Sequence, residues 1–158
     1  MTRFPSFGAY ITVDWNGAAA YGTIGQVADI SGPSITRNDI SVPPDHDQVS
    51  LGSNYIRHFP GASEPGQLTF SLNLDLKNVQ HVGSHAQGTG LLNSFQDTWS
   101  GTGLPTWHYR HASNIPGTAT WSFRGYPVGM NFTMGAVEGS MGADLIIQIS
   151  GVPTLTIA

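Results

Sequence analysis

The stretch Glu64-Pro-Gly-Gln-Leu-Thr-Phe-Ser-Leu-Asn-Leu-Asp-Leu76 alternates apolar and polar residues without a break from Leu68 to its end. Successive side chains of a β-strand point to opposite faces, so this pattern predicts a strand with one face against a core. The other face would carry a polar row with one charge and nothing basic, which comprises Gln67, Thr69, Ser71, Asn73 and Asp75. Such a row could form a smooth, wetted wall beside the core.

The composition favours a single β-rich domain that spans residues 1–158. A chain of 158 residues with 39% apolar residues is large enough to bury a core. Charged residues make up only 10%, against about 25% in an average globular protein. The 20 glycines and 10 prolines are spread over the whole chain. Sparse charge and abundant turn residues indicate strands, and they indicate that part of the surface is buried in an assembly.

The charge balance argues against a protein that grips nucleic acid. The net charge is −4, and Lys77 is the only lysine. Nucleic-acid binding draws most of its affinity from Lys and Arg against phosphates, whereas DNA could slide past such a surface without sticking. The absence of cysteine excludes disulfides and thiolate metal sites. No apolar run approaches the roughly 20 residues of a membrane span, and the start of the chain lacks the apolar core of a secretory signal.

Period and turn signals outside the opening stretch predict seven further strands and one helix. The expected strands are 7–15, 21–30, 34–42, 106–112, 118–126, 128–135 and 144–150. The expected helix runs from Thr89 to Trp99, because Leu91, Leu92, Phe95 and Trp99 share one helical face. Residues 79–90 are interpreted as a polar, glycine-rich connection, and residues 152–158 as an extended tail. The predicted fold is mainly β, a sandwich or barrel of about eight antiparallel strands with one α-helix.

Residues 45–61 have no clean period and are predicted to form a long loop. Long loops in compact domains are commonly functional. This loop would present Asp45, His46, Asp47, Tyr55 and Arg57.

No constellation predicts an enzyme, a metal site or a cofactor site. His46 between two aspartates is interpreted as part of a solvated turn. His81 and His85 have the spacing of helical ligands but lack the glutamate of a metalloprotease motif, so they are expected in a loop with both histidines exposed. His108 and His111 would face opposite sides of one strand.

The four tryptophans raise the alternative of a carbohydrate-binding β-sandwich. Trp99 and Trp121 fall on apolar faces and are expected in the core. Trp15 and Trp107 are open to either interpretation, and sugar binding would need one of them exposed in a groove.

Four segments, taken together and in order, resemble the major tail tube proteins of long-tailed bacteriophages and the related inner-tube proteins of contractile tails and secretion systems. The segments are Gly25-Gln-Val-Ala-Asp-Ile-Ser-Gly-Pro-Ser34, Phe59-Pro-Gly61 with the following Pro65-Gly66 and alternating strand, Trp121-Ser-Phe-Arg-Gly-Tyr126, and Ile149-Ser-Gly-Val-Pro-Thr-Leu155. The resemblance covers nearly the whole chain.

The resemblance implies a tail-tube fold whose protomers form six-fold rings, which stack into a tube that conducts DNA into the host. It implies a structural protein of the virion tail, assembled in the host cytoplasm. Its partners would be copies of itself and tail-tip initiator, tape-measure and tail-terminator proteins. Genomic DNA would pass through without specific binding, and no membrane would be involved.

Two candidate surfaces follow for such a tube. The polar row Gln67, Thr69, Ser71, Asn73 and Asp75 is the candidate lining of the channel, with an ordinary outer surface as the alternative. The loop 45–61 is the candidate ring-stacking element, with a merely mobile surface loop as the alternative. A flexible N-terminal arm, 1–7, and a C-terminal arm, 152–158, would support the stacking contact.

Overall fold

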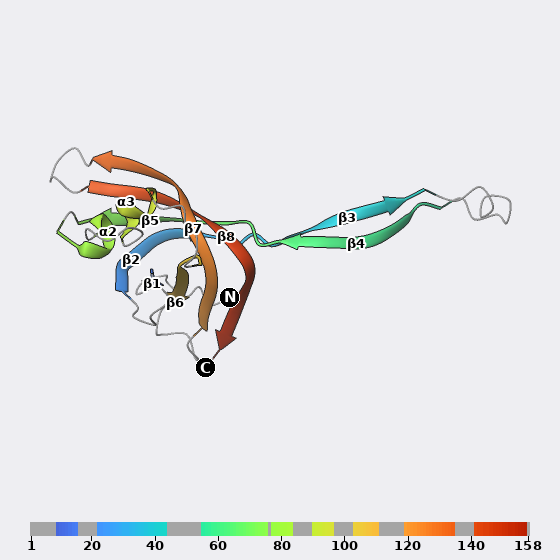
Figure 1. The fold of residues 1–158 in the computed structure, drawn as a ribbon, viewed down its shortest axis with the longest axis horizontal. Helices are drawn as coiled ribbons and strands as arrows, with labels where there is room; N and C mark the ends of the chain where they lie inside the picture. Colours follow the sequence, from blue (N-terminus) through green and yellow to red (C-terminus); the bar gives the residue numbers. More distant parts are fainter. Residues whose placement is uncertain are drawn as a thin grey trace, which may run out of the picture.

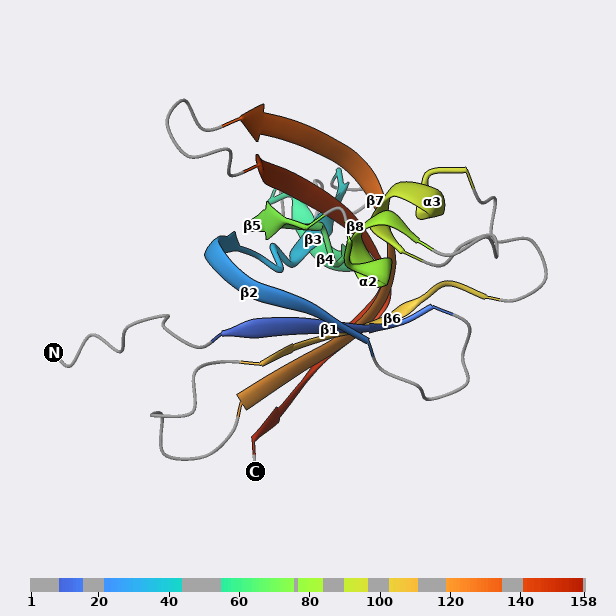
Figure 2. The same cartoon turned by 90° about the vertical axis from the view of Figure 1, so that its left-hand side faces the viewer.

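Six strands of the protein close into an antiparallel barrel, and two more form a separate arm (Figures 1 and 2). The computed structural model describes residues 9–15, 22–43, 55–75, 77–83, 90–96, 103–110, 119–134 and 141–157. The barrel order is β1-β2-β5-β8-β7-β6, with bounds β1 Tyr10–Asp14, β2 Gly22–Ser31, β5 Gln67–Leu74, β6 Thr106–Arg110, β7 Ala119–Met134 and β8 Met141–Ile157. The arm consists of β3 Thr36–Val42 and β4 Arg57–Glu64, and two short helices are α2 Val79–Val82 and α3 Leu91–Ser94.

Strand β5 confirms the alternation that predicts it. Leu68 and Phe70 are completely buried, whereas Gln67, Thr69 and Asn73 are exposed. The strand pairs along its whole length with β8 and also pairs with β2. The central position of β5 in the sheet explains why its apolar face reaches the core without interruption.

Strands β7 and β8 are longer than predicted. The expected strands 118–126 and 128–135 are one continuous strand, because β7 passes Pro127 at a register shift in its pairing with β8. Proline is tolerated at such an irregularity, where a ladder hydrogen bond is already missing. Strand β8 likewise joins the expected strand 144–150 to residues 152–157, of which Thr154–Ile157 pair with β7. The stretch expected as a C-terminal arm is thus barrel wall as far as Ile157.

The helix prediction is wrong in extent and in number. Within the described part of the expected helix, residues 90–96, only Leu91–Ser94 is helical, and Phe95, expected on the apolar face, is 43% exposed. Thr89 and Trp99 lie outside the described residues. A second helix, α2, stands within the segment interpreted as a connection, where the side chain of Asn78 caps it by accepting from the Gln80 amide. Helices of four residues leave too short a pattern to detect from periodicity.

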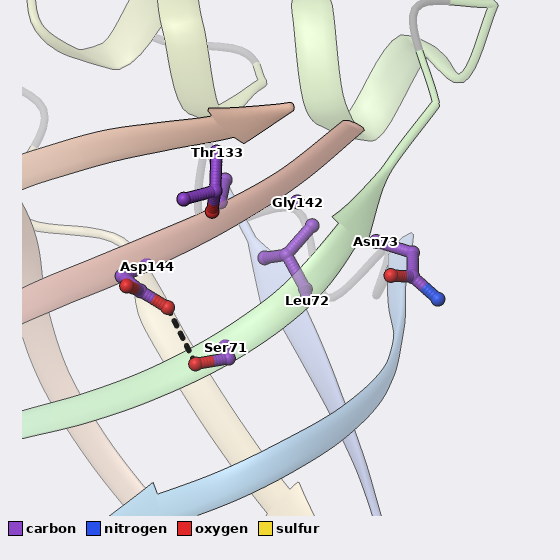
Figure 3. Close-up of a pocket in the computed structure, with 7 residues that line it drawn as sticks. Ser71, Leu72, Asn73, Thr133, Gly142 and Asp144 are labelled. Atoms are coloured by element: carbon purple, nitrogen blue, oxygen red, sulfur yellow. Dashed lines mark hydrogen bonds between the residues drawn. The ribbon is translucent and has the colours of Figure 1, made fainter. Parts of the chain in front are cut away.

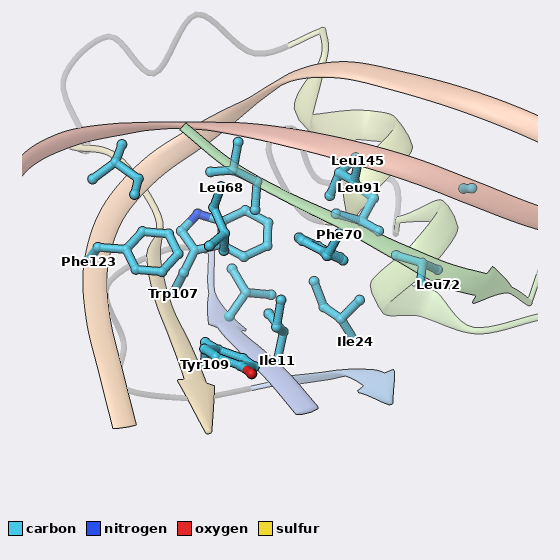
Figure 4. Close-up of a cluster of buried hydrophobic side chains, with 14 of the residues drawn as sticks. Ile11, Ile24, Leu68, Phe70, Leu72, Leu91, Trp107, Tyr109, Phe123 and Leu145 are labelled. Atoms are coloured by element: carbon cyan, nitrogen blue, oxygen red, sulfur yellow. The ribbon is translucent and has the colours of Figure 1, made fainter. Parts of the chain in front are cut away.

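The barrel interior is filled by aliphatic and aromatic side chains (Figure 4). Trp15 and Trp107 are both buried and meet edge to face, with ring centroids 5.3 Å apart. The Trp107 indole donates to the Gly125 carbonyl at 3.0 Å, and the Trp15 indole donates to Gln80 Oε1 at 2.8 Å. Trp121 packs partly buried against the core, as expected. Because Trp15 and Trp107 are core residues, the carbohydrate-binding alternative loses the exposed tryptophan that it required.

Candidate functional surfaces

The polar row of β5 lies on the outer face of the barrel and continues onto β8. Ser71 Oγ donates to Asp144 Oδ1 at 2.5 Å, and Gln67 Nε2 donates to Gln148 Oε1 at 3.1 Å. Each bond joins residues that stand directly opposite each other in the β5–β8 ladder. Asp75 follows the end of β5 and is exposed. The row predicted from the alternation is therefore one side of a wider polar surface that sequence periodicity could not reveal, since β8 lies about seventy residues further on.

A shallow hollow opens on this polar surface (Figure 3). Its empty volume, open solvent included, is about 410 Å³, and it is lined by Ser71, Leu72, Asn73, Thr133, Gly142, Ala143 and Asp144. Asp144 is the one ionisable group among these lining residues, and it already accepts from Ser71. The lining of the hollow offers hydrogen-bonding groups to water but no cationic partner to a phosphate.

The arm corrects the prediction of a loop over residues 45–61. Residues 57–61 belong to β4, which pairs with β3 in a two-stranded sheet that projects from the barrel (Figure 1). Tyr55 precedes β4 and is 80% exposed, and Arg57 opens the strand opposite Val42. Asp45, His46 and Asp47 lie outside the described residues. Strand β4 has no strand pattern in the sequence, because Pro60 and Gly61 interrupt it and no core face imposes alternation on it.

The two faces of the arm differ in polarity. Ile40 and Phe59 stand opposite each other and are 52% and 48% exposed, with Val42 on the same face. The other face carries Asp39 and His58, whose Oδ2 and Nδ1 atoms are 2.6 Å apart. Arg37 Nε also donates to Ser63 Oγ there, at 3.1 Å. A two-stranded sheet alone is marginally stable in water, so an arm that exposes Ile40, Val42 and Phe59 on one face, with Arg57 opposite Val42, favours a partner on that face.

Two glycines set the path of the chain where the arm leaves the barrel. Gly32 and Gly66 have φ of +107° and +71°. A β-carbon on Gly32 would meet the Gln67 carbonyl oxygen, and one on Gly66 would overlap the Ser34 carbonyl oxygen. The Gly66 carbonyl accepts from the Ile149 amide at 3.2 Å and from Gln148 Nε2 at 3.1 Å. The base of the arm is thus fixed to the barrel wall.

The sheet β2–β5–β8–β7 has two edges that no described strand covers. Strand β6 pairs with β7 only from Thr120 to Arg124, so the second half of β7 is bonded on the β8 side alone. Strand β1 pairs with β2 only as far as Gln26, whereas β5 pairs with β2 from Val27 onward. Unpaired strand edges are templates for pairing with another chain.

The histidines do not assemble a metal site within the described ranges, where no group of three or more His, Asp or Glu side chains comes together. His81, which was expected in an exposed position, is buried. His46, His85 and His111 lie outside the described residues. Burial, with a smaller contribution from Arg110, lowers the pKa of His108, and Asp14 opposes the shift. None of the described helices has the length and apolar character that a membrane crossing requires.

No family model and no curated protein matches the sequence. Solved structures nevertheless match over nearly the whole chain. A chain in the PVC sheath/tube terminator of an extracellular contractile injection system, in its extended state, matches with a TM-score of 0.66 at 11% identity, covering 99% of this chain and 98% of that chain. A chain in the anti-feeding prophage tube-terminating cap gives 0.63 at 9% identity, covering 100% and 95%.

A third match extends the likeness to the tail of a gene transfer agent particle. A chain in the tail of the empty gene transfer agent particle, refined with C6 symmetry, has a TM-score of 0.57 at 13% identity and covers 93% of this chain and 94% of that chain. The chain therefore has the tail-tube fold, as the sequence resemblance implies.

Proposed function

We propose that this protein is a structural subunit of a phage-like tail, whose protomers form rings that stack into a hollow tube for the passage of DNA. The observation that carries the proposal is the match of the whole fold, with 93% or more of both chains covered, to chains from three assemblies described by their tubes or tails. If this chain had gained or lost structural elements relative to the matched chains, part of this chain or of the matched chain would be left uncovered. Tail-tip, tape-measure and terminator proteins would be its partners in such a particle.

Ring closure is proposed to use the two open sheet edges. The strands β2, β5, β8 and β7 alternate in direction, so β7 of one protomer would meet β2 of the next antiparallel. This contact joins two different surfaces and can close a ring by repetition. The C6 symmetry of the gene transfer agent tail supports six protomers in the ring. Each sheet would then continue into the next around a common inner wall.

The polar outer face of β5 and β8 is proposed to line the channel. Gln67, Thr69, Ser71, Asn73 and Asp75 form this face together with Asp144 and Gln148. Amide and hydroxyl groups can exchange hydrogen bonds with water and passing phosphates. The carboxylates repel phosphates, so DNA would find no strong binding site on the wall.

Arginine in place of Asn73 and Asp75 is expected to slow DNA release and to leave tube assembly intact. The new cations would face phosphates in the channel, and each phosphate contact should steepen the log–log salt dependence by about 0.9. The measurement is triggered DNA release from particles that carry the variant, followed with an intercalating dye at several salt concentrations. Thr154→Arg, on the exposed far half of β8, is the matched control. If particles with the wild-type protein, the double arginine variant and Thr154→Arg released DNA at equal rates, this face would not line the channel.

The arm is proposed to connect successive rings through its apolar face. Ile40, Val42 and Phe59 would be covered by a protomer of the next ring, and Tyr55 and Arg57 stand at the outer end of the described arm. Asp45, His46 and Asp47 remain candidates for the same contact from the sequence alone. The polar face with Asp39 and His58 would stay in water.

The double variant Ile40→Thr, Phe59→Thr is expected to fold normally and to lose tube growth. Threonine suits a strand but removes the apolar surface, and half-exposed residues outside the core should change the free energy of unfolding by only about 0.5 kcal/mol. Size exclusion and negative-stain electron microscopy are the measurements. Arg37→Gln on the polar face is the control and should form tubes. Normal tubes from the double variant would contradict the role of the apolar face.

Electron microscopy of the concentrated protein, alone and with a tail-tip initiator, tests the proposed function. Long hollow tubes would support the tube subunit. Isolated rings that never elongate would favour an end-capping protein, the alternative suggested by the terminator and cap assemblies among the matches. Monomers under both conditions would contradict the proposal.

A further inference from the structure

The short helix α2 is held against one end of the barrel by side-chain hydrogen bonds. Gln80 lies directly over Gly22 of β2, because a β-carbon on Gly22 would overlap the side-chain amide of Gln80. Its Oε1 accepts from the Trp15 indole at 2.8 Å. A four-residue helix has almost no stability of its own, so these contacts determine whether α2 stays in place.

His81 forms the buried half of this attachment. Its side chain is 3% exposed. Its Nδ1 accepts from the Asp75 amide at 2.8 Å, and its Nε2 lies 2.5 Å from the Ile24 carbonyl oxygen. Because an amide N–H can only donate and a carbonyl oxygen can only accept, this pair of bonds requires the neutral ring with its proton on Nε2. One imidazole thereby joins α2, the end of β5 and β2.

Protonation of His81 is incompatible with this arrangement. A second proton on Nδ1 would face the Asp75 N–H, so two donors would oppose each other and a positive charge would be buried. The charged groups at the end of β5 are Asp75, whose carboxylate accepts from the Lys77 amide at 2.9 Å, and Lys77 itself. Asp14 is the buried carboxylate of nearby β1. Helix α3 and the described side chains of β2 carry no ionisable group.

We propose that His81 is an acid-sensitive latch that releases α2 and the end of β5 from the barrel when the imidazole takes up a proton. Imidazole is the neutral side chain that takes up a proton most readily as the pH falls. Loss of the Nδ1 bond frees the Asp75 amide, and loss of the ring from its buried site removes the link to Ile24. This device is a property of the folded protomer and does not rest on the proposed tube.

Amide hydrogen exchange at Asp75, followed by NMR from about pH 7.5 to about pH 5, tests the latch. After correction for intrinsic exchange, protection of the wild-type amide is expected to fall by up to about tenfold per pH unit, the limit for opening linked to one proton. His81→Asn retains an acceptor near the Nδ1 position, and His81→Gln retains a donor near the Nε2 position, but neither titrates. In whichever variant folds, the protection of the Asp75 amide relative to amides of the barrel core is expected not to fall over the same range.

Two other described histidines, the exposed His58 and the half-buried His108, must be separated from His81 as sources of a pH response. His58→Gln is the control and should behave as wild type. The lowered pKa of His108 means that the unfolded chain binds a proton more readily, so that stability is lost as the pH falls below the ordinary histidine range. That global loss lowers the protection of barrel-core amides in the wild type and in the His81 variants alike, so the readout is the protection of the Asp75 amide relative to those amides, which only the wild type should lose. Constant wild-type protection, or an equal fall in both variants, would overturn the latch.

Discussion

Trp107→Ala is expected to lower the free energy of unfolding by about 3–5 kcal/mol, the range for removing a buried large aromatic side chain. Trp107 is completely buried and meets the ring of Trp15 edge to face. Alanine would leave a cavity in the centre of the barrel and would remove the donor to the Gly125 carbonyl. Urea unfolding followed by far-UV circular dichroism measures the change.

Two further variants separate the causes of this loss. Trp107→Phe retains most of the packing and loses the indole N–H, so it should cost about 1–3 kcal/mol for the unsatisfied Gly125 carbonyl and the smaller ring. Thr69→Ala, on the exposed face of β5, should change stability by no more than about 0.5 kcal/mol. A Trp107→Ala protein as stable as the Thr69→Ala protein would show that this tryptophan is not a core residue.

Gly66→Ala is expected to destabilise the protein by more than the 1–2 kcal/mol or so that a left-handed backbone costs a residue with a β-carbon. Gly66 has φ of +71°, and its β-carbon would also overlap the Ser34 carbonyl oxygen. Relief of that overlap must move the start of β5 or the strand leading into the arm. Because the arm is proposed to connect rings, the variant should also form few or no tubes. Chemical unfolding and electron microscopy measure the two effects.

Gly129→Ala is the matched control for this prediction. A β-carbon on Gly129 would make ordinary contacts, the nearest at 3.6 Å from the Ile146 side chain. Its stability should therefore stay near that of the wild type. If Gly66→Ala and Gly129→Ala were equally stable and both formed tubes, Gly66 would have no special role at the base of the arm.

The strand β5 and its two faces could be predicted because the information is local. Alternation from Leu68 onward needs only the geometry of one strand, and the burial of Leu68 and Phe70 follows it. The same reasoning fails at Pro127, because a turn residue there does not end the strand. The pairing of β7 with β8 from Ala119 to Met134 outweighs one missing amide donor.

The candidate site was predictable only in part. The exposed row on β5 is visible in the sequence, but its partners Asp144 and Gln148 come from a strand that no local pattern connects to it. In the arm, β3 lies within the expected strand 34–42, but the first half of β4 falls in the stretch expected to be a loop, because Phe59 meets no core in the protomer and imposes no alternation. The burial of His81 could not be predicted, because its two hydrogen-bond partners, the Asp75 amide and the Ile24 carbonyl, are backbone groups without a sequence signature.

The sequence by itself determined the β-rich class, the two faces of β5 and the sparse charge of the surface, since each depends on composition or on neighbouring residues. The tertiary structure alone decided that six strands close into a barrel, that β3 and β4 leave it as an arm, and that Trp15 and Trp107 are core residues. These features depend on contacts between distant segments, such as the bond between Trp15 and Gln80, 65 residues apart. Local periodicity shows which face of a strand is apolar, but which segment covers that face depends on the packing of the whole chain.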